Sequence, residues 1–193
     1  TIGRHAQRVS QLSFLRLLRS GRAYQLEAPT LWDVDFRTAV AQAELEDREM
    51  PGAYHRIGFH RGADRVYIET TRPELLPACV ALVAHPDDER YQPLFGSTVT
   101  TPLFGVDVPV LAHHLAEPDK GSGIAMICTF GDTTDVTWWR ELDLPVRSVI
   151  GRDGRLVATP PDHVNPTAYA ELAGRTTKQA QKRVVEMLQE SGD

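Results

Sequence analysis

The sequence predicts an α+β fold that is mainly β, with a β-barrel core flanked by helices. Helical patterns of apolar residues occupy both ends of the 193-residue chain. Between residues 55 and 150, short extended segments alternate with turns rich in Gly, Pro and Asp. The intervening segments are mostly too short for the crossover helices of a doubly wound sheet, which favours a closed or nearly closed sheet.

A helix is predicted over residues 5–20. Four apolar residues would share one of its faces, namely Val9, Leu12, Leu15 and Leu18. Arg19, Gly21 and Arg22 have the composition of a helix end. Residues 23–46 are ambiguous, because YQLEAPTLW looks extended around its proline, whereas AVAQAELE alternates like a strand and has the alanine content of a helix. We expect strands there.

Seven segments between residues 55 and 150 have the composition of strands. They are RIGFH, RVYIETT, CVALVA, STVTT, VDVPVLA, GIAMICT and PVRSVIG. RDGR at residues 152–155 predicts a tight turn after the last of them.

A C-terminal helix is predicted from Thr176 to Ser191. TTKQ offers a capping box, and an apolar face follows at four-residue spacing, made of Ala180, Val184 and Leu188. We expect a single domain in three parts: a helix and connecting strands over about 1–50, the barrel over about 51–160, and a loop and helix over about 161–193.

The composition limits the classes of function. A formal charge of −5 argues against binding nucleic acid through a broad basic face. A local positive group, formed by Arg175, Lys178, Lys182 and Arg183, suits either phosphate or, more commonly, a solvated helix face. Without a long apolar run or a secretory signal, we expect a soluble cytoplasmic protein with no membrane partner. Cys79 and Cys128 form no C-x-x-C pair, which fits a reducing compartment.

Two acidic residues follow an apolar segment in GSGIAMICTFGDTTD, residues 121–135. The segment reads as a buried strand that ends at Phe130-Gly131. Asp132 can cap the helix that DVTWWREL suggests, with Asp135 in its first turn. Capping alone would explain both carboxylates, and a reactive site is the alternative.

A second acidic stretch, VALVAHPDDERY, resembles the A-H-P-D-D-E motif of zinc-dependent de-N-acetylases through His85, Asp87 and Asp88. Such a hydrolase needs at least three protein ligands and an open position on the metal. His113-His114 would have to complete the site, but these residues belong to no matching motif. A surface loop is therefore the favoured interpretation.

The pairing of ETTRPELL, residues 69–76, with G-S-G and D-x-x-D about fifty residues later resembles the editing domain inserted in valyl-, isoleucyl- and leucyl-tRNA synthetases. HPDDERY between them agrees in order and spacing. The flanks LRSGRAYQLEAPTLWDVDFRTAVAQAELED and KRVVEMLQESGD are similar to the valyl members, so the resemblance covers nearly the whole chain. The H-I-G-H and K-M-S-K-S signatures of the ATP site do not occur, so no aminoacylation is expected.

This resemblance implies that the two motifs line one hydrolytic pocket for threonine esterified to the tRNA 3′ end. The implied catalytic residues are Arg72, Asp132 and Asp135. The implied substrate-binding residues are Thr70, Thr71, Glu74, Met126, Cys128 and Asp135. Asp135 would anchor the α-ammonium group, a positioned water would attack the ester, and backbone N–H groups near residues 70–72 or 132 would stabilise the oxyanion.

The implied partners are tRNA(Val) and the remainder of the synthetase, without metal or cofactor. The sequence departs from relatives at Asp33 and Phe36, where zinc-knuckle members have Cys, and at Leu75, Met126 and Cys128. A domain that docks the tRNA end without hydrolysing it is therefore the alternative.

Overall fold

The computed structural model describes residues 2–25, 29–46, 49 and 51–193, in two compact units, residues 1–30 and 31–193. The first unit contains α1 (Arg4–Arg19), which ends before Gly21 at φ 70°, and the predicted helix is thus confirmed. None of the residues of α1 is buried.

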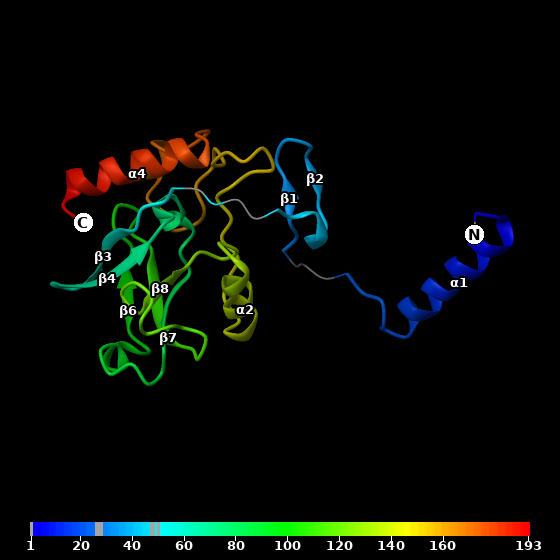
Figure 1. The fold of residues 1–193 in the computed structure, drawn as a ribbon, viewed down its shortest axis with the longest axis horizontal. Helices are drawn as coiled ribbons and strands as arrows, with labels where there is room; N and C mark the ends of the chain where they lie inside the picture. The colour runs from blue at the N-terminus through cyan, green and yellow to red at the C-terminus, as the bar shows by residue number, and fades with distance from the viewer. Residues whose placement is uncertain (1, 26–28, 47–48, 50) are drawn as a thin grey trace. The chain divides into compact units, whose positions relative to one another are not determined.

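The second unit is built on a six-stranded sheet in the order β4-β3-β6-β7-β5-β8 (Figure 1). Its strands are β3 (His55–Arg61), β4 (Asp64–Thr70), β5 (Ala81–Ala84), β6 (Thr98–Thr100), β7 (Asp107–Ala112) and β8 (Ile124–Ile127). Neighbours are antiparallel except for β5 and β7, which are parallel. Because the edge strands β4 and β8 also contact each other, the sheet nearly closes, and the predicted barrel is confirmed.

Helices flank the barrel. They are α2 (Thr133–Glu141), α3 (Pro166–Ala170) and α4 (Thr177–Ser191), with 3-10 helices η1 (Gln42–Glu44), η2 (Pro73–Ala78) and η3 (Gln92–Leu94). The capping box of α4 forms between Thr176 and Gln179, and α4 packs on η2 through its predicted apolar face. Among the described residues, no helix is long and apolar enough to cross a membrane.

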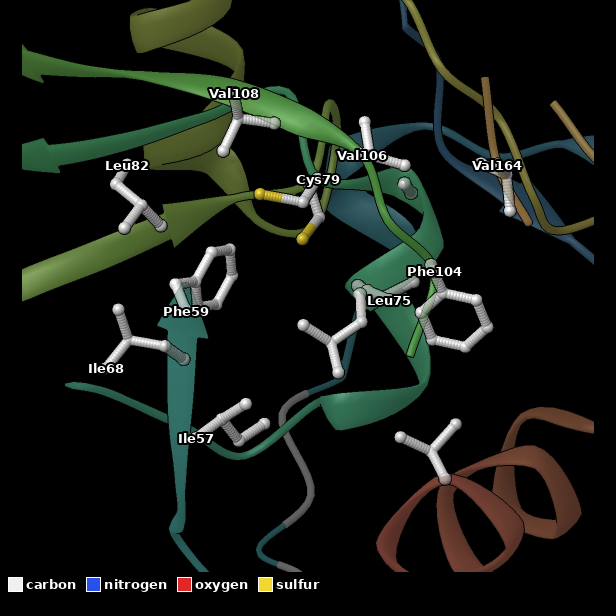
Figure 2. Close-up of a cluster of buried hydrophobic side chains, with 14 of the residues drawn as sticks. Ile57, Phe59, Ile68, Leu75, Cys79, Leu82, Phe104, Val106, Val108 and Val164 are labelled. Carbon is white, nitrogen blue, oxygen red and sulfur yellow. The ribbon is translucent and has the colours of Figure 1, made fainter. Parts of the chain in front are cut away.

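The core follows from the alternation of β3 and β4. Ile57, Phe59 and Ile68 are no more than 1% exposed and belong to one buried cluster with Leu82 and Val108 (Figure 2). Since successive strand residues face opposite sides, the residues between them form the outer face of the hairpin. The burial of these residues inside the barrel therefore determines which side chains of the hairpin face outward.

The expectation of strands over residues 23–46 is largely wrong where the structure describes this segment. Only β1 (Trp32–Asp33) and β2 (Thr38–Ala39) pair; residues 26–28 lie outside the described part. The Asp33 carboxylate accepts hydrogen bonds from the backbone N–H groups of Asp35 and Phe36. The Glu44 carboxylate accepts one from the backbone N–H of Ala41. These side-chain bonds favour turns over strands.

The expected strand in PVRSVIG is also wrong, because only a single bridge forms there, between Ile150 and Leu156. Arg147 instead donates its backbone N–H to the Thr129 hydroxyl (3.0 Å) and its guanidinium to the Cys79 carbonyl. The predicted turn at residues 152–155 is confirmed, with Gly154 at φ 71°.

The helix α4 carries most of its charge in ion pairs. Arg183 contacts Glu171, Glu186 and Glu190, and Lys182 contacts Glu186. A solvated, internally paired face is thus the better interpretation of this positive group.

Replacing Leu82 by Ala should lower the free energy of unfolding by about 2–5 kcal/mol, because it leaves a cavity in a fully buried strand. Leu45→Ala is the matched control, since Leu45 is 51% exposed, and should change it by less than about 0.5 kcal/mol. Urea denaturation followed by circular dichroism measures both. Equal losses would contradict this assignment of the core.

Candidate functional site

A cavity of about 340 Å³ opens where the ends of β4 and β8 meet the start of α2. Seven of the residues predicted for the site line it: Thr70, Thr71, Arg72, Met126, Cys128, Asp132 and Asp135. Glu74 is not among the lining residues. The structure therefore brings together two sequence motifs that are about sixty residues apart.

Asp132 caps α2. Its Oδ1 accepts hydrogen bonds from the backbone N–H groups of Thr134 (2.7 Å) and Asp135 (2.9 Å), as the sequence predicts for an N-cap. Capping and a place in the cavity are compatible, since Asp132 does both. The cap also orients the first turn of α2, which carries Asp135.

Asp135 is 6% exposed, and its two carboxylate oxygens have different surroundings. Oδ2 accepts hydrogen bonds from the backbone N–H groups of Gly131 (3.0 Å) and Cys128 (3.4 Å). Within the described residues, no hydrogen-bond donor reaches Oδ1. The protein thus holds one oxygen in place and leaves the other available in the cavity.

Burial is the main cause that raises the pKa of Asp135 to about 6, and the nearby charge of Asp132 adds to it. The two backbone hydrogen bonds and Arg72 act in the opposite direction. At neutral pH Asp135 is therefore mainly a desolvated anion, which a bound cation would stabilise. Burial also raises the pKa of the Cys128 thiol, so this wall of the cavity is uncharged.

Arg72 connects the two motifs. Its Nε donates to Glu74 Oε1 (3.1 Å) and its Nη1 to the Gly131 carbonyl (3.3 Å). In the described part of the chain, Nη2 makes no hydrogen bond. The buried Glu74 carboxylate thus acts on Arg72, not on the cavity, which alters the role expected for it.

Several backbone donors expected near the site are engaged within the protein. The N–H of Arg72 donates to the Thr70 hydroxyl (3.0 Å), and those of Thr134 and Asp135 donate to Asp132. The free Nη2 of Arg72 is thus a better candidate than these groups to stabilise negative charge in the cavity.

Sequence reasoning missed the far wall of the cavity, which includes Leu115 and Trp138. Both are held by His113, whose Nδ1 lies 3.1 Å from the Trp138 indole N–H nitrogen and from the Leu115 backbone nitrogen. Its Nε2 contacts Glu141 (2.8 Å). The adjacent His113-His114 pair was the available signal, but it suggested a metal site.

HPDDERY supports the cavity rim. Asp88 is 7% exposed and pairs with the Arg90 guanidinium (2.6 Å), whose hydrogen bond is the main cause that lowers the Asp88 pKa. Arg90 also donates to the Pro118 carbonyl (2.8 Å). A Cβ atom at Gly123 would lie only 2.4 Å from Arg90 Nη2. Glycine at this position therefore lets the segment 121–123, which lines the cavity through Gly121 and Gly123, approach the Asp88–Arg90 ion pair.

This geometry does not suit the metal-hydrolase alternative, because the Asp88 carboxylate already binds Arg90 through both oxygens. Over the described residues, no three His, Cys, Asp or Glu side chains come together as a group that could hold a metal ion.

Asp135→Asn should stabilise the chain at pH 7. The folded-state pKa lies above the unfolded value of about 3.9, so the parent chain loses stability as the pH rises from about 4 to 6. The amide keeps an oxygen for the Gly131 and Cys128 N–H groups and carries no charge. We expect a gain of up to about 3 kcal/mol in the free energy of unfolding at pH 7.

Urea denaturation between pH 4 and 8 measures this gain, which should vanish near pH 4. Asp143→Asn, at an exposed acid outside the cavity, is the control and should show no such pH dependence. A gain independent of pH would contradict the buried-charge explanation.

Comparisons with known proteins identify relatives of the whole chain. The chain is 68% identical over 197 residues to the valine–tRNA ligase of Leifsonia xyli subsp. xyli and 68% identical over 198 residues to that of Thermobifida fusca. It is 64% identical over 198 residues to the valine–tRNA ligase of Cutibacterium acnes. No family model matches the chain.

Each match covers 100% of this chain but only 22–23% of the relative. The chain thus spans less than a quarter of the length of these relatives. Full coverage at this identity confirms the resemblance noted in the sequence: the chain belongs to the valine–tRNA ligase family and corresponds to one segment of its members.

Proposed function

We propose that this chain is an editing domain that hydrolyses the ester of threonine mischarged on tRNA(Val). The observation that carries the proposal is the free Oδ1 of Asp135 in a cavity formed by both motifs. A desolvated carboxylate there suits the α-ammonium group of an aminoacyl ester. The remainder of the ligase and the tRNA are the proposed partners.

The need for such a site follows from the shape of the amino acids. A pocket sized for valine rejects the nearly isosteric threonine poorly, a limitation already documented for valyl-tRNA synthetases. A second pocket that binds the threonine hydroxyl would exclude valine, which would leave the polar partner desolvated at a cost of about 1–3 kcal/mol. Thr70, Thr71 and Asp135 line the cavity and are the candidate partners.

The reaction needs a positioned water and a stabilised oxyanion. Water adds to the ester carbonyl carbon, the bond from this carbon to the ribose oxygen breaks, and a proton passes to the ribose oxygen. Arg72 Nη2 is the proposed donor to the oxyanion. Asp132 positions α2, and Glu74 positions Arg72. No side chain is assigned as general base.

A docking domain without hydrolysis is the second candidate. It is favoured by the engaged N–H groups of Arg72, Thr134 and Asp135, which leave few backbone donors for an oxyanion. Binding of threonyl-tRNA(Val) without release of threonine would support this alternative over the first.

Asp135→Asn should reduce kcat/KM for threonyl-tRNA(Val) deacylation at least about 100-fold, because the ammonium group loses its charged partner. Release of labelled threonine measures kcat/KM in the 193-residue chain and in a chimaeric ligase. The chimaeric ligase is the Leifsonia xyli enzyme that carries this chain in place of its own matching segment. Asp132→Asn is the matched control: Asn caps as well as Asp, so this variant should retain most of the activity.

Parental activity in the Asp135→Asn variant would show that Asp135 does not anchor the substrate. Equal losses of kcat/KM in both variants would show that the total negative charge of the cavity matters and that Asp135 has no specific role.

The deacylation rate should depend on pH in a bell shape. Below about pH 6, protonation of Asp135 removes the anchor, and kcat/KM should fall up to about tenfold per pH unit. Above about pH 8, the substrate amino group loses its own proton. A pH profile of kcat/KM from 5 to 9 measures both limbs, and the acid limb should be absent in Asp135→Asn. An unchanged acid limb in that variant would assign it to another group.

A further inference from the structure

The outer face of the β3–β4 hairpin carries a group of basic and aromatic side chains that the site described above does not use. Arg56 pairs in register with Glu69, and Gly58 with Tyr67. A Cβ atom at Gly58 would lie 3.2 Å from both the Arg65 and the Tyr67 side chains. Gly58 therefore leaves room for Arg65 and Tyr67 to lie flat across the strand.

These side chains line a hollow of about 430 Å³, together with Arg61, Arg90 and Tyr91. The hollow adjoins the editing cavity, because Glu69 lines both. The 121–123 loop also lies between them, because Gly121 and Gly123 line the cavity and Ser122 lines the hollow. The Ser122 backbone carbonyl accepts a hydrogen bond from the Tyr91 hydroxyl (2.6 Å). A ligand that fills the cavity can thus continue into the hollow.

The charges around the hollow are only partly neutralised. Arg65 pairs with Asp193 (3.0 Å) and Arg90 with Asp88 (2.6 Å), while Asp64 and Glu69 are the acids that line the hollow. Within the described residues, no carboxylate lies within 4.0 Å of a guanidinium nitrogen of Arg56 or Arg61.

Two cations of the hollow thus remain free on a chain whose formal charge is −5, with Arg61 opposite Asp64 at the turn of the hairpin and Arg56 nearer the cavity end. The Arg56 guanidinium lies over the Tyr67 ring, 4.4 Å from its centroid. Such stacking orients a planar donor at a small cost in side-chain entropy.

We propose that this hollow along the β3–β4 hairpin, with Arg56 and Arg61 as its free cations, binds the single-stranded RNA that leads to the aminoacylated 3′ end. The inference rests on the proposed function, which places the aminoacyl ester in the adjoining cavity. Every nucleotide before the terminal adenosine carries a phosphate, and guanidinium groups bind phosphate through paired N–H donors. The surface contributes affinity for the strand and leaves the choice of amino acid to the cavity.

The test compares the double variant Arg56→Gln, Arg61→Gln with Arg152→Gln. Arg152 is the matched control because it is exposed and also stacks on an aromatic ring, that of Trp32 (5.4 Å), but does not line the hollow. Binding of a labelled single-stranded RNA ending in CCA is measured by fluorescence anisotropy from 50 to 300 mM KCl. Deacylation of threonyl-tRNA(Val) and of threonyl-adenosine is measured in the chimaeric ligase.

The double variant should bind the RNA about five- to tenfold more weakly, and its slope of log K against log salt should fall by about 0.7 for each phosphate that the variant no longer neutralises. KM for threonyl-tRNA should rise by a similar factor with kcat unchanged. Threonyl-adenosine, which reaches only the cavity, should react as in the parent protein.

The proposal is overturned if the double variant matches Arg152→Gln in affinity and salt slope, or if threonyl-adenosine turnover falls equally. Destabilisation of the chimaera with unchanged RNA binding would also overturn it and assign the face to a protein contact. If the parent hydrolyses neither substrate, the proposed function fails, while the RNA-binding comparison still decides this inference.

Discussion

The site depends on two hydrogen bonds made by the backbone of Gly131. Its N–H donates to Asp135 Oδ2 and its carbonyl accepts from Arg72 Nη1, so one residue joins the motif after β4 to the motif after β8. A Cβ atom at this position would lie 2.5 Å from Asp135 Oδ2. Glycine is therefore needed for close approach, and the same residue binds an anion through its N–H and a cation through its carbonyl.

This arrangement carries an electrostatic cost. Asp135 is buried beside a second carboxylate, and its raised pKa expresses that cost. Two backbone N–H groups and Arg72 reduce the cost without removing it, which leaves the site suited to a cationic group. Functional sites commonly contain a buried charge that lowers the stability of the fold. The cap by Asp132 keeps the Asp135 carboxylate in place although burial makes its ionisation unfavourable.

The β3–β4 hairpin serves the barrel and the proposed RNA surface at once. Ile57, Phe59 and Ile68 fill the interior, and the alternation of the strands sends Arg56 and Tyr67 outward. Because β4 ends at Thr70, directly before the cavity, any strand bound along the hairpin is led toward Asp135. The ion pair of Asp88 and Arg90 supports the same region, because Arg90 lines the hollow and lies next to Gly123 of the cavity.

Local signals in the sequence determined the helices at both ends, six of the strands and the cap at Asp132, because these depend on periodicity and on bonds between neighbouring residues. Tertiary structure decided what such signals do not contain. In place of a strand, the segment at 40–46 contains η1 and a local bond from the Ala41 N–H to Glu44. The segment at 145–150 makes long-range bonds to Thr129 and Cys79 through Arg147. Glu74 binds Arg72, and His113 holds the wall of the cavity. Glu74 is close to Arg72 in sequence, but Arg72 also reaches the Gly131 carbonyl, 59 residues away. The other outcomes depend on a partner that is distant in sequence or on competition between a side chain and the sheet for the same backbone group, and only the closed barrel sets those distances.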